Sequence, residues 1–209
     1  PSEATQSRPR RWTRWLLWIG VGFVAVITVS LIAGVAFTRY SIHRAFPQTD
    51  GSIRVPGLMA NVEVIRDPMG VPHIYADTAE DLFLAQGYVH AQDRFFQMDF
   101  WRHISYGRLA ELFGEDQMET DVFLRTLGWG GLAEAQYRGE TPANRRFLDA
   151  YAEGVNAYVG TNSPAELSFE YSIIELLNHA YDPEPWTGAQ SLAWGKVMGA
   201  AGWNCIGWP

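Results

Sequence analysis

The pattern of hydrophobic and polar positions divides the chain into an apolar N-terminal segment and a longer body of mixed character. Residues 15–37 carry no charge, and as a helix rising 1.5 Å per residue they are long enough to cross the roughly 30 Å of bilayer hydrocarbon. Arginines precede this segment, which predicts a cytoplasmic basic tail over residues 1–14, a membrane anchor over 15–37 and an extracytoplasmic main domain. A cleaved signal peptide is the alternative, but its apolar part is typically shorter, about 7–15 residues.

After the anchor, the pattern predicts a polar tether over residues 38–54 and then a β-hairpin. Residues 62–66 alternate apolar and polar positions, as a half-buried strand does, and residues 71–75 form a second short apolar run. Turn-forming residues at 67–70 separate the two runs. Pro72 confines its strand to a sheet edge or places it at a strand start.

Helical periodicity dominates the rest of the body. Thr78, followed by two acidic residues, predicts a helix start. Apolar positions then continue to Phe113, which is long for one helix, so we expect two helices with a break near Ser105 to Gly107. Further helices are expected at about 118–128, 142–160 and 165–178, then a rigid loop over 182–186 and a last helix from near Gly188. The predicted fold class is α+β and mainly helical, with an N-terminal β-hairpin followed by helices.

Composition and charge narrow the possible functions. The formal net charge is −7, and the body has no basic stripe, which argues against a nucleic-acid partner. The single cysteine, Cys205, excludes an intramolecular disulfide and a cysteine-rich zinc site. A nucleophilic Cys205, freed by cleavage after Asn204, is less expected than a small buried thiol, because the sequence shows no partner to activate it. We predict no metal ligands in this chain and no cofactor.

The stretch HAQDRFFQMDFWR, residues 90–102, is the densest cluster of candidate chemistry. On a helix, Gln86, His90, Asp93 and Gln97 fall on one polar stripe. Because the surrounding helix is apolar nearly all round, we predict that the stripe is buried and fully hydrogen-bonded. His90, Asp93, Arg94 and Gln97 would then form a structural network. A His90–Asp93 general-base pair is the alternative, but the sequence shows no nucleophile beside His90.

The order of several motifs resembles the α chain of the penicillin acylase (penicillin amidase) family, which belongs to the N-terminal nucleophile hydrolases. The resemblance covers about residues 55–198. Its motifs are Arg66-Asp67, GVPHI at 70–74, GYVHAQDRFFQM at 87–98, GRLAELFG at 107–114, YAEGVNAY at 151–158 and EPW at 184–186.

The resemblance implies an amide hydrolase built from two chains of one precursor. Its nucleophile is the N-terminal serine of a β chain, and that serine's own amine is the base. This chain would be the α-chain part of an αββα fold, would contain no catalytic residue and would pack around the β chain. Met198 matches a family position that lines the acyl pocket. The substrates implied are small amides: aromatic-acyl penicillins, cephalosporin side chains or acyl-homoserine lactones.

The last residues depart from the family pattern. Residues 199–209 fit it poorly, and Trp208 stands near the place of an acid that binds the family's structural calcium, so we expect that calcium site to be incomplete. A frameshift or a truncation would explain this departure. Two functions are therefore expected: the α-chain portion of a membrane-anchored amidohydrolase, inactive alone, or a membrane-anchored helical interaction module without catalysis.

Overall fold

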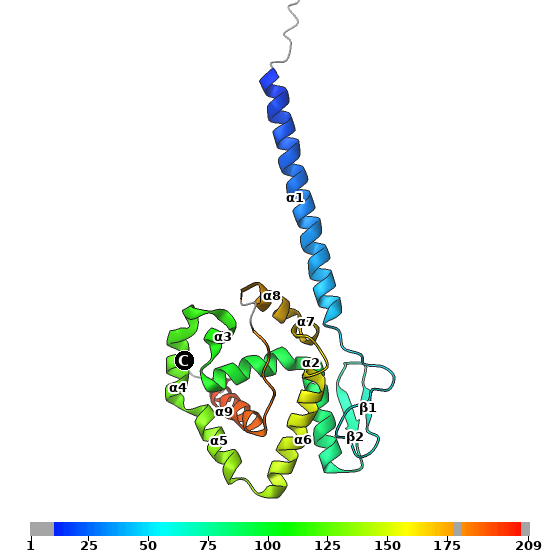
Figure 1. Cartoon of the computed structure of the whole chain (residues 1–209), viewed down its shortest axis with the longest axis vertical. Helices are drawn as coiled ribbons and strands as arrows, with labels where there is room; N and C mark the ends of the chain where they lie inside the picture. The colour runs from blue at the N-terminus through cyan, green and yellow to red at the C-terminus, as the bar shows by residue number, and fades with distance from the viewer. Residues whose placement is uncertain (1–10, 178–180, 206–209) are drawn as a thin grey trace, which may run out of the picture. The chain divides into compact units, whose positions relative to one another are not determined.

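The computed structural model describes residues 11–177 and 181–205, and it divides into two compact units, residues 1–43 and 44–209. The described part of the first unit is the helix α1, Arg11–Arg44 (Figure 1). Among the described residues, α1 alone is long and apolar enough to cross a membrane, and a signal sequence near an N-terminus would meet the same test. The hydroxyls of Thr28 and Thr38 donate to carbonyls four residues earlier, which satisfies these polar groups inside the helix.

The segment predicted as a tether, residues 38–54, begins inside a helix. Residues 38–44 belong to α1. Farther along, within the second unit, Gln92 Nε2 donates to the backbone carbonyl of Gln48 at 2.6 Å.

The second unit begins with the predicted β-hairpin. The strands β1, Glu63–Arg66, and β2, Pro72–Tyr75, pair antiparallel, and Pro72 stands at a strand start as expected. Asp67 Oδ1 closes the turn by accepting from the backbone N–H groups of Met69 and Val71, each at 2.9 Å. The hairpin prediction is confirmed.

Helix α2, Ala79–Tyr106, follows the hairpin and begins at the predicted cap, since Thr78 Oγ1 accepts from the Asp81 N–H at 3.1 Å. Gly107 ends the helix with φ +61°, a left-handed conformation that favours glycine. The expected break is therefore confirmed. The sequence did not predict the kink inside α2 at Arg94, where φ is −147° and ψ is 25°.

Shorter helices complete the unit. They are α3 Leu109–Phe113, the 3-10 turn η1 Glu115–Gln117, α4 Met118–Leu127, α5 Trp129–Gly139, α6 Pro142–Val159, α7 Pro164–Leu167, α8 Phe169–Leu177 and α9 Gly188–Cys205. The helices predicted at 118–128 and 142–160 are confirmed. The helix predicted at 165–178 is two helices, separated at Ser168, whose backbone is extended. Helix α5 was not predicted, and α9 continues through residues 199–205 of the divergent end.

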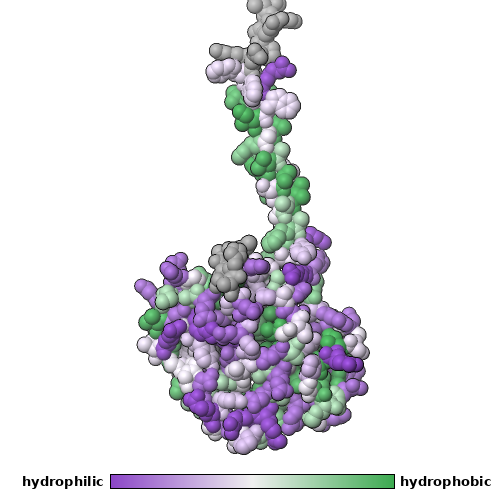
Figure 2. Space-filling view, viewed as in Figure 1, coloured by the Kyte–Doolittle hydropathy of each residue, from purple (hydrophilic) through white to green (hydrophobic). Residues whose placement is uncertain are grey.

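The core forms where α2 packs along α6 (Figure 1). Two glycines permit this close approach: a Cβ on Gly87 would lie 2.0 Å from the Tyr151 carbonyl oxygen, and one on Gly154 would lie 1.9 Å from that of Leu84. Around this contact, α8 and the loop before α9 add aromatic side chains to the core. Its members include Phe95, Met98, Leu112, Tyr158, Tyr171 and Trp186. The visible outer face of the unit is mainly hydrophilic, with separate small apolar patches (Figure 2).

Candidate functional site

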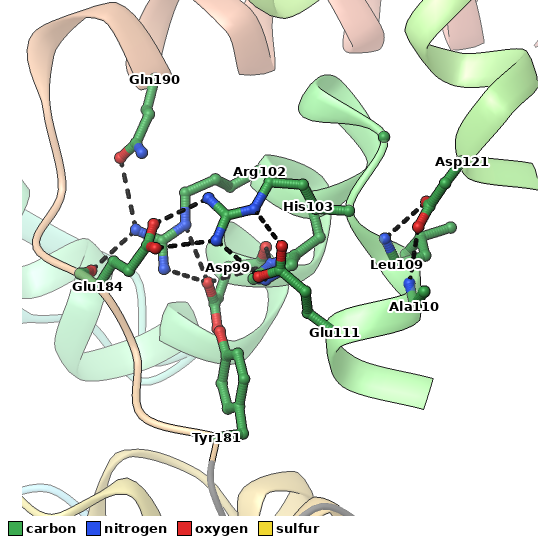
Figure 3. Close-up of polar contacts among 12 residues, drawn as sticks. Asp99, Arg102, His103, Leu109, Ala110, Glu111, Asp121, Tyr181, Glu184 and Gln190 are labelled. Atoms are coloured by element: carbon green, nitrogen blue, oxygen red, sulfur yellow. Dashed lines mark hydrogen bonds and ion pairs between the residues drawn. The ribbon is translucent and has the colours of Figure 1, made fainter. Parts of the chain in front are cut away.

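A buried cluster of charged and polar side chains lies in the second half of α2. Asp99, Arg102 and His103 are exposed by only 0%, 1% and 2%, respectively. Asp99 accepts hydrogen bonds from Arg102 Nε at 3.0 Å and from the Tyr171 hydroxyl at 2.6 Å, and also from Arg102 Nη2 and the Tyr181 hydroxyl. Figure 3 shows the Tyr181 hydroxyl directed at the Asp99 carboxylate. One carboxylate thus joins α2 to α8 and to the loop before α9.

Arg102 extends the cluster toward the start of α9. Its Nη1 donates to the Glu184 carbonyl at 2.8 Å and to Gln190 Oε1 at 3.4 Å (Figure 3). Its guanidinium lies 5.5 Å from the centre of the Trp186 ring. The Glu184 side chain forms a two-bond ion pair with Arg108, which lies just before α3. The loop before α9 is therefore held through both its backbone and its side chains.

His103 has one satisfied and one unsatisfied ring nitrogen. Nδ1 lies 2.7 Å from the backbone carbonyl of Asp99, and because a carbonyl only accepts, Nδ1 carries the proton of that bond. Nε2 is buried without a hydrogen bond, 3.8 Å from Glu111 Oε2. No hydroxyl or thiol nucleophile contacts either nitrogen in the described part of the chain, so this histidine has the geometry of a structural residue.

Electrostatics support the structural interpretation. Burial alone would raise the pKa of Asp99, but the hydrogen bond and charge of His103 and the charge of Arg102 hold it well below its usual range. Burial and the neighbouring Asp99 carboxylate raise the pKa values of Tyr171 and Tyr181. The cluster is therefore an anion surrounded by neutral hydroxyl donors and a guanidinium, and none of these shifts activates a nucleophile.

The predicted network of His90, Asp93, Arg94 and Gln97 does not form a buried site, because none of the four residues is fully buried. They make separate contacts: Asp93 pairs with Arg66 of the hairpin at 2.8 Å, Arg94 donates to Gln97 at 3.2 Å, and His90 Nδ1 lies 3.0 Å from the Tyr151 hydroxyl. Asp93 thus ties the helix to the hairpin, whereas the hydrogen bond of Arg94 lies within its own helix. The kink at Arg94 separates His90 and Asp93 from the buried cluster, while Gln97 lies on the same side of the kink as the cluster.

The other candidate residues lie apart from this cluster. Met198 is 40% exposed on α9. An open cleft of about 430 Å³ lies between α5, α6 and the start of α9, and Met198 does not line it. The side chain of Cys205 and all of Trp208 lie outside the described residues. Within the described residues, no group of histidine, cysteine and carboxylate side chains could hold a metal ion.

Comparison with known proteins identifies the family. The family model for penicillin amidase matches residues 61–205. The chain belongs to the penicillin amidase family. This confirms the resemblance stated from the motifs.

Individual members of the penicillin amidase family agree with this result. The chain is 37% identical over 161 residues to the penicillin acylase 2 proenzyme of Pseudomonas sp. (strain SE83), a match that covers 77% of this chain and 20% of the relative. It is 39% identical over 145 residues to the acyl-homoserine lactone acylase QuiP of Pseudomonas aeruginosa, covering 68% and 16%. The chain therefore spans a fifth or less of the length of these curated relatives.

A solved structure supports the fold. The thermostable penicillin G acylase from Alcaligenes faecalis superposes with a TM-score of 0.58 at 32% sequence identity, covering 68% of this chain and 73% of that one. The mainly helical body with a two-stranded sheet is thus similar to a penicillin acylase chain.

Proposed function

We propose that residues 55–198 form the α-chain portion of a penicillin-acylase-like amidohydrolase. The enzyme would cleave a carboxamide by acyl transfer to the N-terminal serine of a β chain encoded by the same precursor. The observation that carries this proposal is the penicillin amidase match over residues 61–205. The similarity to one chain of penicillin G acylase supports it, because 73% of that chain is covered.

The described contacts favour a supporting role for this portion. His90, the histidine of the alternative general-base pair, has the Tyr151 hydroxyl as its partner, and burial raises the pKa of Tyr151 to about 12. A phenol with that pKa is almost entirely protonated at neutral pH and is a poor nucleophile. In this proposal the nucleophile and base come from the β chain, the chain alone turns over no amide, and it carries no complete calcium site.

The same proposal treats α1 as an uncleaved membrane anchor with a cytoplasmic N-terminus and an extracytoplasmic main domain. The 23-residue uncharged segment and the arginines before it support this topology. Mass spectrometry of the membrane fraction tests it: the anchor predicts a chain that retains residues 15–37. A mature chain that begins after this segment would show a signal sequence instead.

Co-expression tests the enzymatic proposal. The chain is produced alone and together with the β-chain region of the Pseudomonas penicillin acylase 2, and each preparation is assayed with phenylacetyl and long-chain acyl chromogenic amides. The expected result is turnover only when both chains are present. Turnover by this chain alone would contradict the proposal. Stable association of the chains without turnover would favour the alternative of an interaction module.

A further inference from the structure

The loop over residues 181–187 leads to the start of α9, and one side chain on α6 hydrogen-bonds to its backbone. Asn156 Oδ1 accepts from the Trp186 backbone N–H at 2.6 Å, and Asn156 Nδ2 donates to the Trp186 carbonyl at 2.9 Å. A single amide side chain thus satisfies both backbone polar groups of Trp186, as a neighbouring strand would. The path of the chain is therefore fixed two residues before α9 begins at Gly188.

The first turn of α9 is bound to the same loop. Thr187 and Gln190 cap the helix reciprocally: Gln190 Oε1 accepts from the Thr187 N–H at 3.0 Å, and Thr187 Oγ1 accepts from the Gln190 N–H at 3.4 Å. The Trp186 indole N–H donates to Ser191 Oγ at 2.9 Å. Any shift of Trp186 therefore carries the start of α9 with it.

The loop packs against the core with one face and lines a cleft with the other. Trp186 is buried at 4% exposure with Arg102 over its ring. On the other side, Asn156, Trp186 and Thr187 line the open cleft of about 430 Å³. At the cleft, the two hydrogen bonds of Asn156 hold the Trp186 backbone, while the core holds its ring.

We infer that Asn156 is a positioning residue that sets the placement of α9 through the backbone of Trp186. Helix α9 presents Trp194 and Met198, one turn apart and 42% and 40% exposed, on its surface. Met198 lies ten residues, or about 15 Å, from Gly188, and a rigid helix transmits a tilt at its start over that length. The inference rests on the proposed function in one respect: this surface of α9 is taken to contribute to acyl-group binding in the assembled amidase.

Amide hydrogen exchange of the full chain in detergent micelles tests the positioning. Asn156→Leu removes both bonds at similar volume, and Asn156→Asp retains only the acceptor. Asn162→Leu is the matched control, because the Asn162 amide bonds only to Tyr158 and Thr161 at the end of α6. We expect exchange at residues 190–198 to accelerate about tenfold in Asn156→Leu, which corresponds to about 1.4 kcal/mol, and by less in Asn156→Asp. Exchange in α2 should change in neither variant.

A kinetic measurement on the co-expressed chains then separates the two proposals. Asn156→Leu is expected to raise KM severalfold with kcat nearly unchanged, since it displaces a binding surface and leaves the nucleophile in place. Unchanged exchange in α9, or equal acceleration throughout the fold, would overturn the positioning role. An inactive parent assembly would refute the proposed function, while the exchange result would still decide the role of Asn156.

Discussion

Replacing Asp99 with asparagine should destabilise the fold far more than the same replacement at Asp93. The Asp99→Asn substitution would keep the shape of the side chain but remove the negative charge that faces Arg102 at full burial. Breaking a buried ion pair by removing one partner costs about 3–5 kcal/mol, because the remaining charge is left uncompensated. The Tyr171 and Tyr181 hydroxyls would also lose a charged acceptor.

Asp93 provides the matched comparison on the same helix. It also pairs with an arginine through two hydrogen bonds, but the side chains of Asp93 and Arg66 remain 26% and 19% exposed. Solvent screening limits such a pair to about 1 kcal/mol or less. The two substitutions therefore remove the same chemical group from pairs that differ mainly in burial.

Urea unfolding of the full chain in a fixed detergent, followed by tryptophan fluorescence, measures both variants. With a slope of about 2 kcal/mol per molar urea, Asp99→Asn should lower the midpoint by about 2 M and Asp93→Asn by no more than about 0.5 M. Equal midpoint shifts, or a shift below about 0.5 M for Asp99→Asn, would refute the conclusion that burial makes this carboxylate indispensable.

The pH dependence provides an independent check on Asp99. Its folded-state pKa is lowered, so its contribution to stability is fully present above the ordinary aspartate pKa of about 3.9 and is lost as pH falls through the folded value. The deficit of Asp99→Asn relative to the parent chain should therefore be constant above about pH 4 and shrink in stronger acid.

Two further predictions concern helix packing and histidine titration. Gly154→Ala should destabilise the fold by about 3 kcal/mol, because its Cβ would lie 1.9 Å from a backbone oxygen of α2. Gly131→Ala should instead stabilise the fold by about 0.5–1 kcal/mol, because Gly131 is exposed and a Cβ there would have nothing within 4 Å. Thermal unfolding compares the two variants, and equal effects would contradict the assigned packing. His90 should titrate below pH 6.5 in an NMR experiment, because burial of its ring lowers its pKa, and Asp93→Asn should lower it further by removing a charge that raises it. Since this folded-state pKa is depressed, the associated stability is present above about pH 6.5 and declines as pH falls through the folded value; a normal or raised pKa would contradict this sign.

The local features of the fold could be predicted from sequence because their causes are local. Thr78 caps α2 through its own hydroxyl, and Gly107 ends that helix in a left-handed conformation, so neither depends on distant residues. Helix α5 was not predicted, because it depends on a contact with a residue outside the helix. Gly130 and Gly131 lower its helix propensity, but Gly130 is needed because a Cβ there would lie 2.6 Å from the Tyr106 ring. The sequence shows the low helix propensity of these glycines, but it does not show that Tyr106 lies too close for a larger residue at position 130.

The predicted burial of the polar stripe is wrong, whereas its structural role stays a prediction. The stripe from Gln86 to Gln97 assumes an uninterrupted helix, but no proline or glycine predicts the kink at Arg94. The kink is not the whole reason, because His90 and Asp93 lie before it and are already unburied. The buried residues Asp99, Arg102 and His103 follow the helical spacing of three and four residues that was assigned to the earlier stripe. Their spacing was visible, but only the partners Tyr171, Tyr181 and Gln190, far along the chain, show that this set is the buried one.

The polar density of residues 90–102 follows from the position of α2 in the fold. Before the kink, Asp93 binds the hairpin through Arg66. After it, Asp99 and Arg102 bind α8, the loop before α9 and α9 itself. Apolar contacts tolerate small shifts, whereas a buried carboxylate and guanidinium must meet donors and acceptors at fixed distances. A helix that contacts several segments therefore needs a separate polar side chain for each contact. These contacts account for the many polar residues in the stretch without giving any of them a catalytic role.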